Sequence, residues 1–309
     1  MAEQKTIYKT YKYRLYPNKK QEAIFNEWLE TCRRLYNYFI QQRMDRWEKI
    51  KDLPKEERKY ISFFDQLKHL TQIKKENKYL QRVYAHVLQD VASRVNSTYK
   101  RFYQARKKGT KLGGLPKFKQ RKEYNSFKYN EYQNGKRFRI IGNKIFLGKV
   151  GLVKIIIDRP LPDNISIRTC VVKRDCTNWY ACITFSFTKV YEEKILNKSK
   201  AIGLDMGIKS YGALSNGEKI ENPKWINRHE KKLAHEQRLL SRKIKGSSNW
   251  KKQCIKLAKI YQKIRFQRKD FIHKQTTLLV KAYDIIALED LQITNIMRNR
   301  YLAKSINEV

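Results

Sequence analysis

The chain has 309 residues, and its 69 Lys and Arg against 29 Asp and Glu give a formal net charge of +40 at pH 7. A soluble domain gains no stability from such self-repulsion, so the composition indicates a polyanionic partner whose phosphates release counterions on neutralisation. The excess is spread along the whole chain, and we expect a long path over nucleic acid, with no membrane span and no secretory signal.

The five cysteines are scattered and form no C-x-x-C pair, so the sequence indicates neither a zinc ribbon nor a disulfide framework. We therefore expect a cytoplasmic protein. The many Tyr, Phe and Trp side chains between the basic residues suit stacking on bases, although most of them are expected to be core residues.

The first part of the chain predicts one strand followed by helices. Residues 6–15 alternate in polarity and end at Tyr16-Pro17-Asn18, which is typical of a strand and a stop. Apolar side chains then recur at spacings of three and four over three segments, which predicts helices over residues 19–46, 63–73 and about 79–105. Residues 17–116 are expected to form a helical domain.

The middle of the chain predicts short antiparallel strands. The expected strands are residues 137–141, 144–147, 153–157, 166–174 and 179–187. Close spacing of this kind favours a small barrel over residues 117–199, and we expect residues 1–16 to supply its first strand.

Residues 200–309 predict an α/β domain. An Asn216-Gly217 hairpin turn follows the strand that ends at Asp205. Two long basic helices are expected at about 224–244 and 249–282, and a further strand leads to Glu289. A helical tail is expected from about Asn299.

Asp205 and Glu289 are the candidate catalytic residues. Each follows a short apolar strand, and two-metal nucleases hold Mg²⁺ between carboxylates from separate strands. For either acid alone, a strand end facing water is the simpler interpretation. Asp290 is expected to point to the opposite face of the strand. The chain stops at Val309 without a later strand for a third carboxylate, so we expect an incomplete or vestigial site with weak metal binding at most.

Several segments resemble the TnpB family of transposon-associated, RNA-guided nucleases, which are relatives of the compact type V CRISPR effectors. The resemblance spans the chain, and its order and spacing match the family. It rests on Tyr13-Arg-Leu-Tyr-Pro-Asn, Arg34-Leu-Tyr-Asn-Tyr-Phe, Gly114-Leu-Pro-Lys-Phe-Lys, Gly203-Leu-Asp205-Met-Gly-Ile-Lys, and Ala287-Leu-Glu289-Asp-Leu with Asn299-Arg-Tyr-Leu-Ala-Lys-Ser-Ile.

The resemblance implies an α+β multidomain protein: a helical recognition lobe, a small antiparallel β-barrel called the wedge, and an incomplete RuvC or ribonuclease-H-like α/β domain. It implies that Asp205 and Glu289 match the family's first two catalytic acids, whereas the third acid and the family's zinc module are absent. It also implies contacts to a short DNA motif beside the target. The residues matched to that motif are Phe63, Ala85, His86, Gln89 and Ser126.

The expected function is RNA-guided binding of matched double-stranded DNA, with a structured guide RNA as partner and Mg²⁺ as the ion if one is bound. Base pairing would then read the sequence. We expect a nuclease-deficient protein that acts as a transcriptional repressor near the nucleoid. The alternatives are an RNA-guided transposon endonuclease, here shortened, and a plain basic RNA-binding protein.

Overall fold

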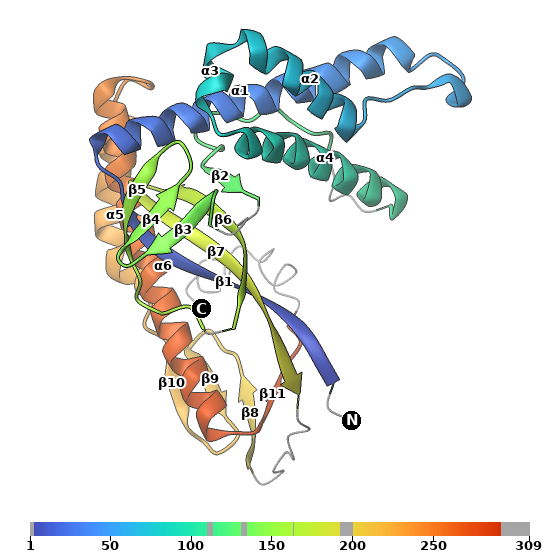
Figure 1. The fold of residues 1–309 in the computed structure, drawn as a ribbon. Coiled ribbons are helices and arrows are strands. Elements are labelled where there is room, and N and C mark those ends of the chain that lie inside the picture. The colour runs from blue at the N-terminus through green and yellow to red at the C-terminus, as the bar shows by residue number, and fades with distance from the viewer. Residues whose placement is uncertain (1–2, 110–113, 131–134, 163, 192–199, 292–309) are drawn as a thin grey trace. The chain divides into compact units, whose positions relative to one another are not determined.

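A computed structural model describes residues 3–109, 114–130, 135–162, 164–191 and 200–291 (Figure 1). The chain divides into two compact units, Met1–Tyr191 and Glu192–Val309, and each is described by itself. No helix within these described residues is long and apolar enough to cross a lipid bilayer. The helical tail predicted from about Asn299 lies outside the described residues.

The first unit contains a seven-stranded antiparallel sheet with the order β2-β6-β7-β1-β5-β4-β3. The N-terminal strand β1 (Glu3–Tyr16) lies at its centre, because it pairs with β7 on one side and with β5 on the other. The other strands are β2 (Ser126–Tyr129), β3 (Phe138–Ile141), β4 (Lys144–Leu147), β5 (Gly151–Ile156), β6 (Ser166–Asp175) and β7 (Asn178–Tyr191).

The sheet is strongly curled, because side chains of its two end strands meet. The rings of Tyr129 on β2 and Phe138 on β3 lie with their centroids 6.2 Å apart. The Tyr129 hydroxyl also donates a 3.0 Å hydrogen bond to the carbonyl of Gly148. No hydrogen-bonded pairing between β2 and β3 is present in the described residues, so closure into a barrel stays a prediction.

Helices pack on this sheet through one shared apolar core. They are α1 (Lys19–Ile50), α2 (Phe63–Glu76), α3 (Lys78–Arg82) and α4 (Ala85–Lys107), with a short 3₁₀ turn at Lys55–Glu57. The side chain of Asn18 begins α1 by accepting from the Gln21 backbone amide, which satisfies a free donor of the first turn. Buried Phe25 and Trp28 of α1 both contact Phe127 of β2, at 5.5 and 5.4 Å between ring centroids.

The third predicted helix, about 79–105, is wrong in one respect, because the structure breaks it into α3 and α4. Val83 and Tyr84 are extended at the break, with ψ angles of 145° and 132°. Tertiary contacts explain the break: Val83 is fully buried, and the Tyr84 ring lies on Tyr129 at 5.5 Å. A Cβ atom at Gly148 would lie 3.0 Å from that ring, so any other residue there would force the Tyr84 ring to shift. Apolar residues keep a helical spacing through the predicted helix, so the sequence pattern does not reveal the break between α3 and α4.

The second unit contains a four-stranded mixed sheet, β10-β9-β8-β11, and a helical hairpin (Figure 1). Its elements are β8 (Ala201–Asp205), β9 (Ser210–Leu214), β10 (Lys219–Glu221), α5 (Trp225–Ser241), α6 (Ser248–Ala282) and β11 (Ile285–Leu288). Gly217 adopts φ +89° in the turn between β9 and β10, as the predicted Asn-Gly hairpin requires. Helices and sheets in both units confirm the α+β class.

Candidate functional site

The two predicted catalytic carboxylates end neighbouring parallel strands. β11 pairs with β8 in parallel, with Leu288 opposite Leu204. One residue further along each strand come Glu289 and Asp205, so both carboxylates lie at the same edge of the sheet. Because partners in a parallel register point to the same face, continuing this register by one residue past the end of β11 predicts that the two side chains share a face. Both residues are exposed.

The alternation of apolar residues fixes which face the carboxylates take. Ile202, Leu204 and Ile286 pack with Leu279 and Tyr283 at the end of α6. Successive side chains of a strand point to opposite faces, so Asp205 lies on the face away from this cluster, and the same alternation predicts that face for Glu289, one residue past β11. The sequence folds this way because the apolar strand residues require cover from α6, whereas the carboxylates require water or a cation.

The turn after Asp205 is tight. A Cβ atom added at Gly207 would lie 3.2 Å from the carbonyl oxygen of Ser210, so a side chain there would have to displace backbone. This contact keeps the chain close as it turns from β8 into β9, directly beside Asp205. Gly207 is therefore explained by backbone packing, whether or not a metal binds.

Few side chains at this edge of the sheet could bind a metal ion. Carboxylate oxygens are the ligands that Mg²⁺ takes, so the pair fits part of the shell of one hard cation. The part of the chain that the structure describes holds no group of three or more His, Cys, Asp or Glu side chains placed to bind a metal ion. Asp290 lies beyond the end of β11, where the Leu291 amide donates to the Glu289 carbonyl at 3.2 Å, so its expected orientation toward the opposite face stays a prediction.

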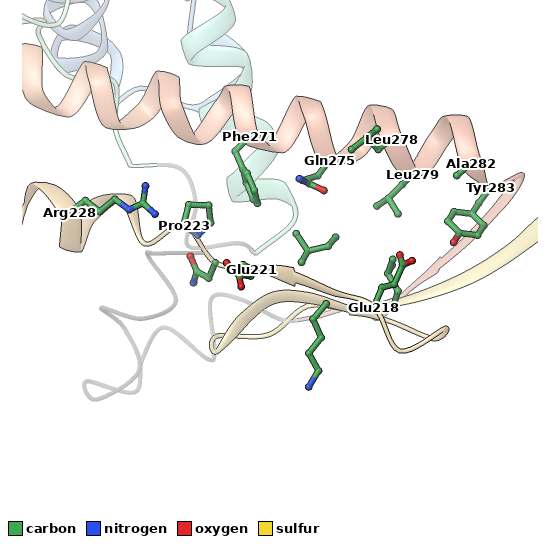
Figure 2. A pocket seen from close by; sticks show the side chains of 14 residues that line it. Glu218, Glu221, Pro223, Arg228, Phe271, Gln275, Leu278, Leu279, Ala282 and Tyr283 are labelled. Carbon is green, nitrogen blue, oxygen red and sulfur yellow. The ribbon is translucent and has the colours of Figure 1, made fainter.

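A separate cleft of about 700 Å³ lies between α6 and the β9–β10 hairpin (Figure 2). Phe271, Leu278 and Leu279 of α6 form its apolar wall, and Glu218 and Glu221 lie on the hairpin side. Neither Asp205 nor Glu289 lines it. The two carboxylates are therefore brought together by strand register and lie outside this cleft.

Three of the five predicted DNA-motif residues come together at the start of α4. Ala85, His86 and Gln89 occupy its first two turns, and the His86 Nδ1 atom lies 2.8 Å from Gln89 Oε1. Ala85 and Gln89 line a groove of about 400 Å³ with Leu70, Lys74, Lys75 and Gln81. Gln89 is exposed, so its amide is accessible to a base edge.

Ser126 is connected to α4 through an arginine. Arg94 Nη1 donates to the Ser126 carbonyl at 3.0 Å and lies 3.2 Å from its hydroxyl. Arg94 is in turn held by Asp90, with 2.6 Å between Nε and Oδ2. Ser126 lies on β2, a strand that the sequence pattern did not predict and that is held by its pairing with β6.

Phe63 lies apart from the other motif residues. It begins α2, contacts Phe64 at 5.4 Å between ring centroids and packs partly buried on the core. The α2 residues that line the groove begin at Leu70, about 10 Å further along the helix at 1.5 Å per residue.

Sequence reasoning missed two lysines beside this groove. Burial, and then the charge of Lys149, lower the pKa of Lys74. Lys149 comes from the turn between β4 and β5 and donates a 2.5 Å hydrogen bond from Nζ to the Gln81 carbonyl. Nothing in the sequence indicates that residues 74 and 149 approach each other, because only tertiary packing joins them.

Comparison with known proteins covers both units. The family model described as "Probable transposase" matches residues 185–300, and one described as "Helix-turn-helix domain" matches residues 2–52. A putative RNA-guided DNA endonuclease of Streptomyces pristinaespiralis is 31% identical over 306 residues, which are 98% of this chain and 71% of that protein. The chain belongs to the TnpB family.

A second relative and a solved structure agree with the TnpB assignment. The putative RNA-guided DNA endonuclease InsQ of Escherichia coli K12 is 27% identical over 94% of this chain and 67% of its own length. The fold resembles that in the cryo-EM structure of the Cas12f1-sgRNA-target DNA complex, with a TM-score of 0.52 and 13% identity over 98% of this chain and 86% of that one. At this identity the likeness shows the fold alone.

The structure differs from the description of the N-terminal family match. Residues 3–16 form the strand β1, and residues 19–50 form the single helix α1. This segment of the TnpB chain therefore contains no helix-turn-helix among its described residues.

Proposed function

We propose that this TnpB-family chain binds matched double-stranded DNA under the direction of a structured guide RNA. The observation that carries this proposal is the similarity to a putative RNA-guided DNA endonuclease over 98% of the chain. The +40 charge supports a nucleic-acid partner, since each phosphate neutralised by a basic side chain releases counterions. Base pairing would read the target, and the protein would read shape and a short flanking motif.

Each segment has a proposed role. Residues 17–116 would form the recognition lobe, residues 1–16 and 117–199 the wedge, and residues 200–309 the RuvC-like domain. The guide RNA would lie on the basic surfaces of the wedge and the RuvC-like domain.

Flanking-motif recognition is proposed for the groove at the start of α4. Gln89 is exposed there, and a glutamine amide can pair with both N6 and N7 of adenine in the major groove. His86 supports this role, because its contact with Gln89 orients the amide. Ala85 would let the groove approach the base pair closely, and Ser126 and Phe63 would contribute from β2 and α2.

We further propose that the 309-residue chain holds its target without cutting it and acts as a transcriptional repressor near the nucleoid. A two-metal mechanism needs ions on both sides of the scissile phosphate. The described residues offer only Asp205 and Glu289 at the candidate edge, which would hold one Mg²⁺ weakly. A bound complex that does not cut would block passage of a polymerase.

The alternative function is RNA-guided DNA cleavage. The register that places Asp205 beside Glu289 favours cleavage, because both of these acids are still present in the chain. A third carboxylate would then have to come from elsewhere.

Sequencing of the nucleic acid that co-purifies with the full chain tests the guided function against plain RNA binding. One defined structured RNA with a variable end is the expected result. Bulk ribosomal RNA without such a species would contradict the proposal and favour a plain basic RNA-binding protein.

A further inference from the structure

The hairpin of α5 and α6 concentrates positive charge far above the average of the chain. Residues 225–282 contain 17 Lys and Arg against 3 Asp and Glu. The two helices are joined by a narrow apolar seam in which Leu233 contacts the cluster of Ile260 and Ile264. Beside this seam the helices leave a groove of about 400 Å³.

Four lysines face this groove, which we call the lysine groove. Lys232 comes from α5, and Lys256, Lys259 and Lys263 come from one face of α6. The α6 lysines follow at spacings of three and four, so they stand one above another on the helix surface. They span seven residues, or about 10 Å of helix axis.

These lysines have no acidic partner. Within the described ranges, none of the four forms an ion pair. The nearby carboxylate of Glu236 instead accepts from Gln253 Nε2, and His229 Nε2 lies 3.1 Å from Gln267 Oε1. Further along α6, Lys274 does have a partner, Asp270, at 2.8 Å. Like charges at these spacings destabilise a helix, so the arrangement is costly unless an anion occupies the groove.

We propose that the lysine groove binds the phosphate backbone of duplex RNA. Successive phosphates of one strand advance by about 3.4 Å along B-form DNA and by a similarly short step along duplex RNA, so the line of α6 lysines, about 10 Å long, spans about three phosphate steps. Lysine acts as a point charge on phosphate. None of the described residues that line the groove is Tyr, Phe or Trp, and the imidazole of His229 is engaged by Gln267, so the groove offers no broad stacking platform of the kind that single strands use.

RNA fits this groove better than target DNA, and this step rests on the proposed function. The self-repulsion of the hairpin is present in every state of the protein, including before a target is found. A guide RNA would be bound throughout, whereas target DNA would be bound only at the end of the search. The guide RNA, which would be bound throughout, is therefore the partner that offsets the positive charge of the hairpin.

Lysine acetylation measured by mass spectrometry tests the site residue by residue. The full chain is freed of nucleic acid in high salt and then mixed with a short RNA duplex or a DNA duplex of the same sequence. With RNA, acetylation of Lys256, Lys259 and Lys263 should fall several-fold, while the exposed lysines Lys251 and Lys269 outside the groove should change little. Equal change at both sets, no change at either, or protection by DNA alone would overturn the proposal.

A pair of matched variants gives a second readout. K259Q/K263Q removes two charges from the groove, and K251Q/K269Q removes two from the same helix outside it. The first should make the plot of log affinity for the RNA duplex against log salt shallower by about 1.5 units, and the second by much less. Equal slopes in both variants would contradict the site. Co-purification of ribosomal RNA would defeat the guided function without altering these results, so the two failures are distinguishable.

Discussion

Leu288 lies opposite Leu204 in the parallel pairing of β11 with β8, and this register places Glu289 beside Asp205 at one edge of the sheet. Two carboxylates that are 84 positions apart in sequence thus become neighbours through backbone hydrogen bonds alone. The relationship supplies hard oxygen ligands on one exposed face, and the chemistry expected at this edge depends on it.

Gln89→Ala should weaken preference for the flanking motif and leave RNA affinity unchanged, because the exposed amide is assigned to base readout. Loss of one bidentate contact should reduce discrimination by about 1–3 kcal/mol. Gln104→Ala provides the control, since Gln104 is an exposed glutamine further along the same helix. Binding to DNA duplexes with intact and altered motifs measures the effect. Loss of RNA binding with an unchanged DNA preference would refute the assignment.

Asp90→Asn should destabilise the first unit. Asp90 is buried and its carboxylate holds Arg94 at 2.6 Å, so the variant leaves a largely buried guanidinium without its counter-ion. The expected loss is about 3 kcal/mol of unfolding free energy. Glu27→Gln, which breaks the exposed contact with Arg82, should cost under about 1 kcal/mol. Urea unfolding followed by tryptophan fluorescence compares the variants, and equal midpoints would show that the buried pair contributes nothing.

Glu30 should give the first unit an acid-dependent stability. The hydrogen bond from Arg33, followed by that from Arg34, lowers the pKa of Glu30 from 4.5 to about 2 despite partial burial. Because the folded-state pKa is depressed, the stabilisation is complete above pH 4.5 and is lost as the pH falls toward 2.

Glu30→Gln should therefore lower the unfolding free energy by about 2 kcal/mol near pH 6, after allowance for solvent screening at exposed Arg34. The difference from the unmodified chain should shrink as the pH approaches 2. Glu48→Gln, in an exposed pair with Lys51, is the matched control and should change little at any pH. A difference for Glu30→Gln that stays constant between pH 6 and pH 2 would exclude this linkage.

RNA binding should depend steeply on salt. With a net charge of +40, phosphate contacts should dominate, and each one contributes about −0.7 to −0.9 to the slope of log affinity against log salt. Filter binding or fluorescence anisotropy over a salt series measures this slope. A nearly flat plot would mean that base contacts, and not phosphates, supply the affinity.

Local structure was readable from the sequence wherever one pattern dominated. The predicted strand over residues 144–147 agrees with β4, and the helix expected from Lys19 begins there, although it extends to Ile50. Alternating polarity and strong caps carry this information within a few residues. Where tertiary contacts determine the local structure, the sequence pattern did not predict it. The break at Val83 and Tyr84 depends on a close approach to Gly148, and β2 is visible only through its pairing with β6.

In the candidate site, too, local features could be predicted from the sequence, whereas features set by tertiary packing could not. Asp205 and Glu289 were recognisable because each ends an apolar strand, but only the parallel register brings them together. Ala85, His86 and Gln89 share a helix start, so their proximity is local. Phe63 does not line the groove, because α2 reaches it only from Leu70 onward, and helix packing of this kind cannot be read from spacing alone.

The most direct test of the proposed function incubates the guided complex of the 309-residue chain with matched, motif-bearing DNA and Mg²⁺. The proposal predicts guide-dependent binding without cleavage, and it predicts that Asp205→Ala binds the DNA as tightly as the unmodified chain. Strand cleavage that disappears in Asp205→Ala would contradict it. That result would establish the endonuclease alternative and would require a further acid to complete the metal site at this edge.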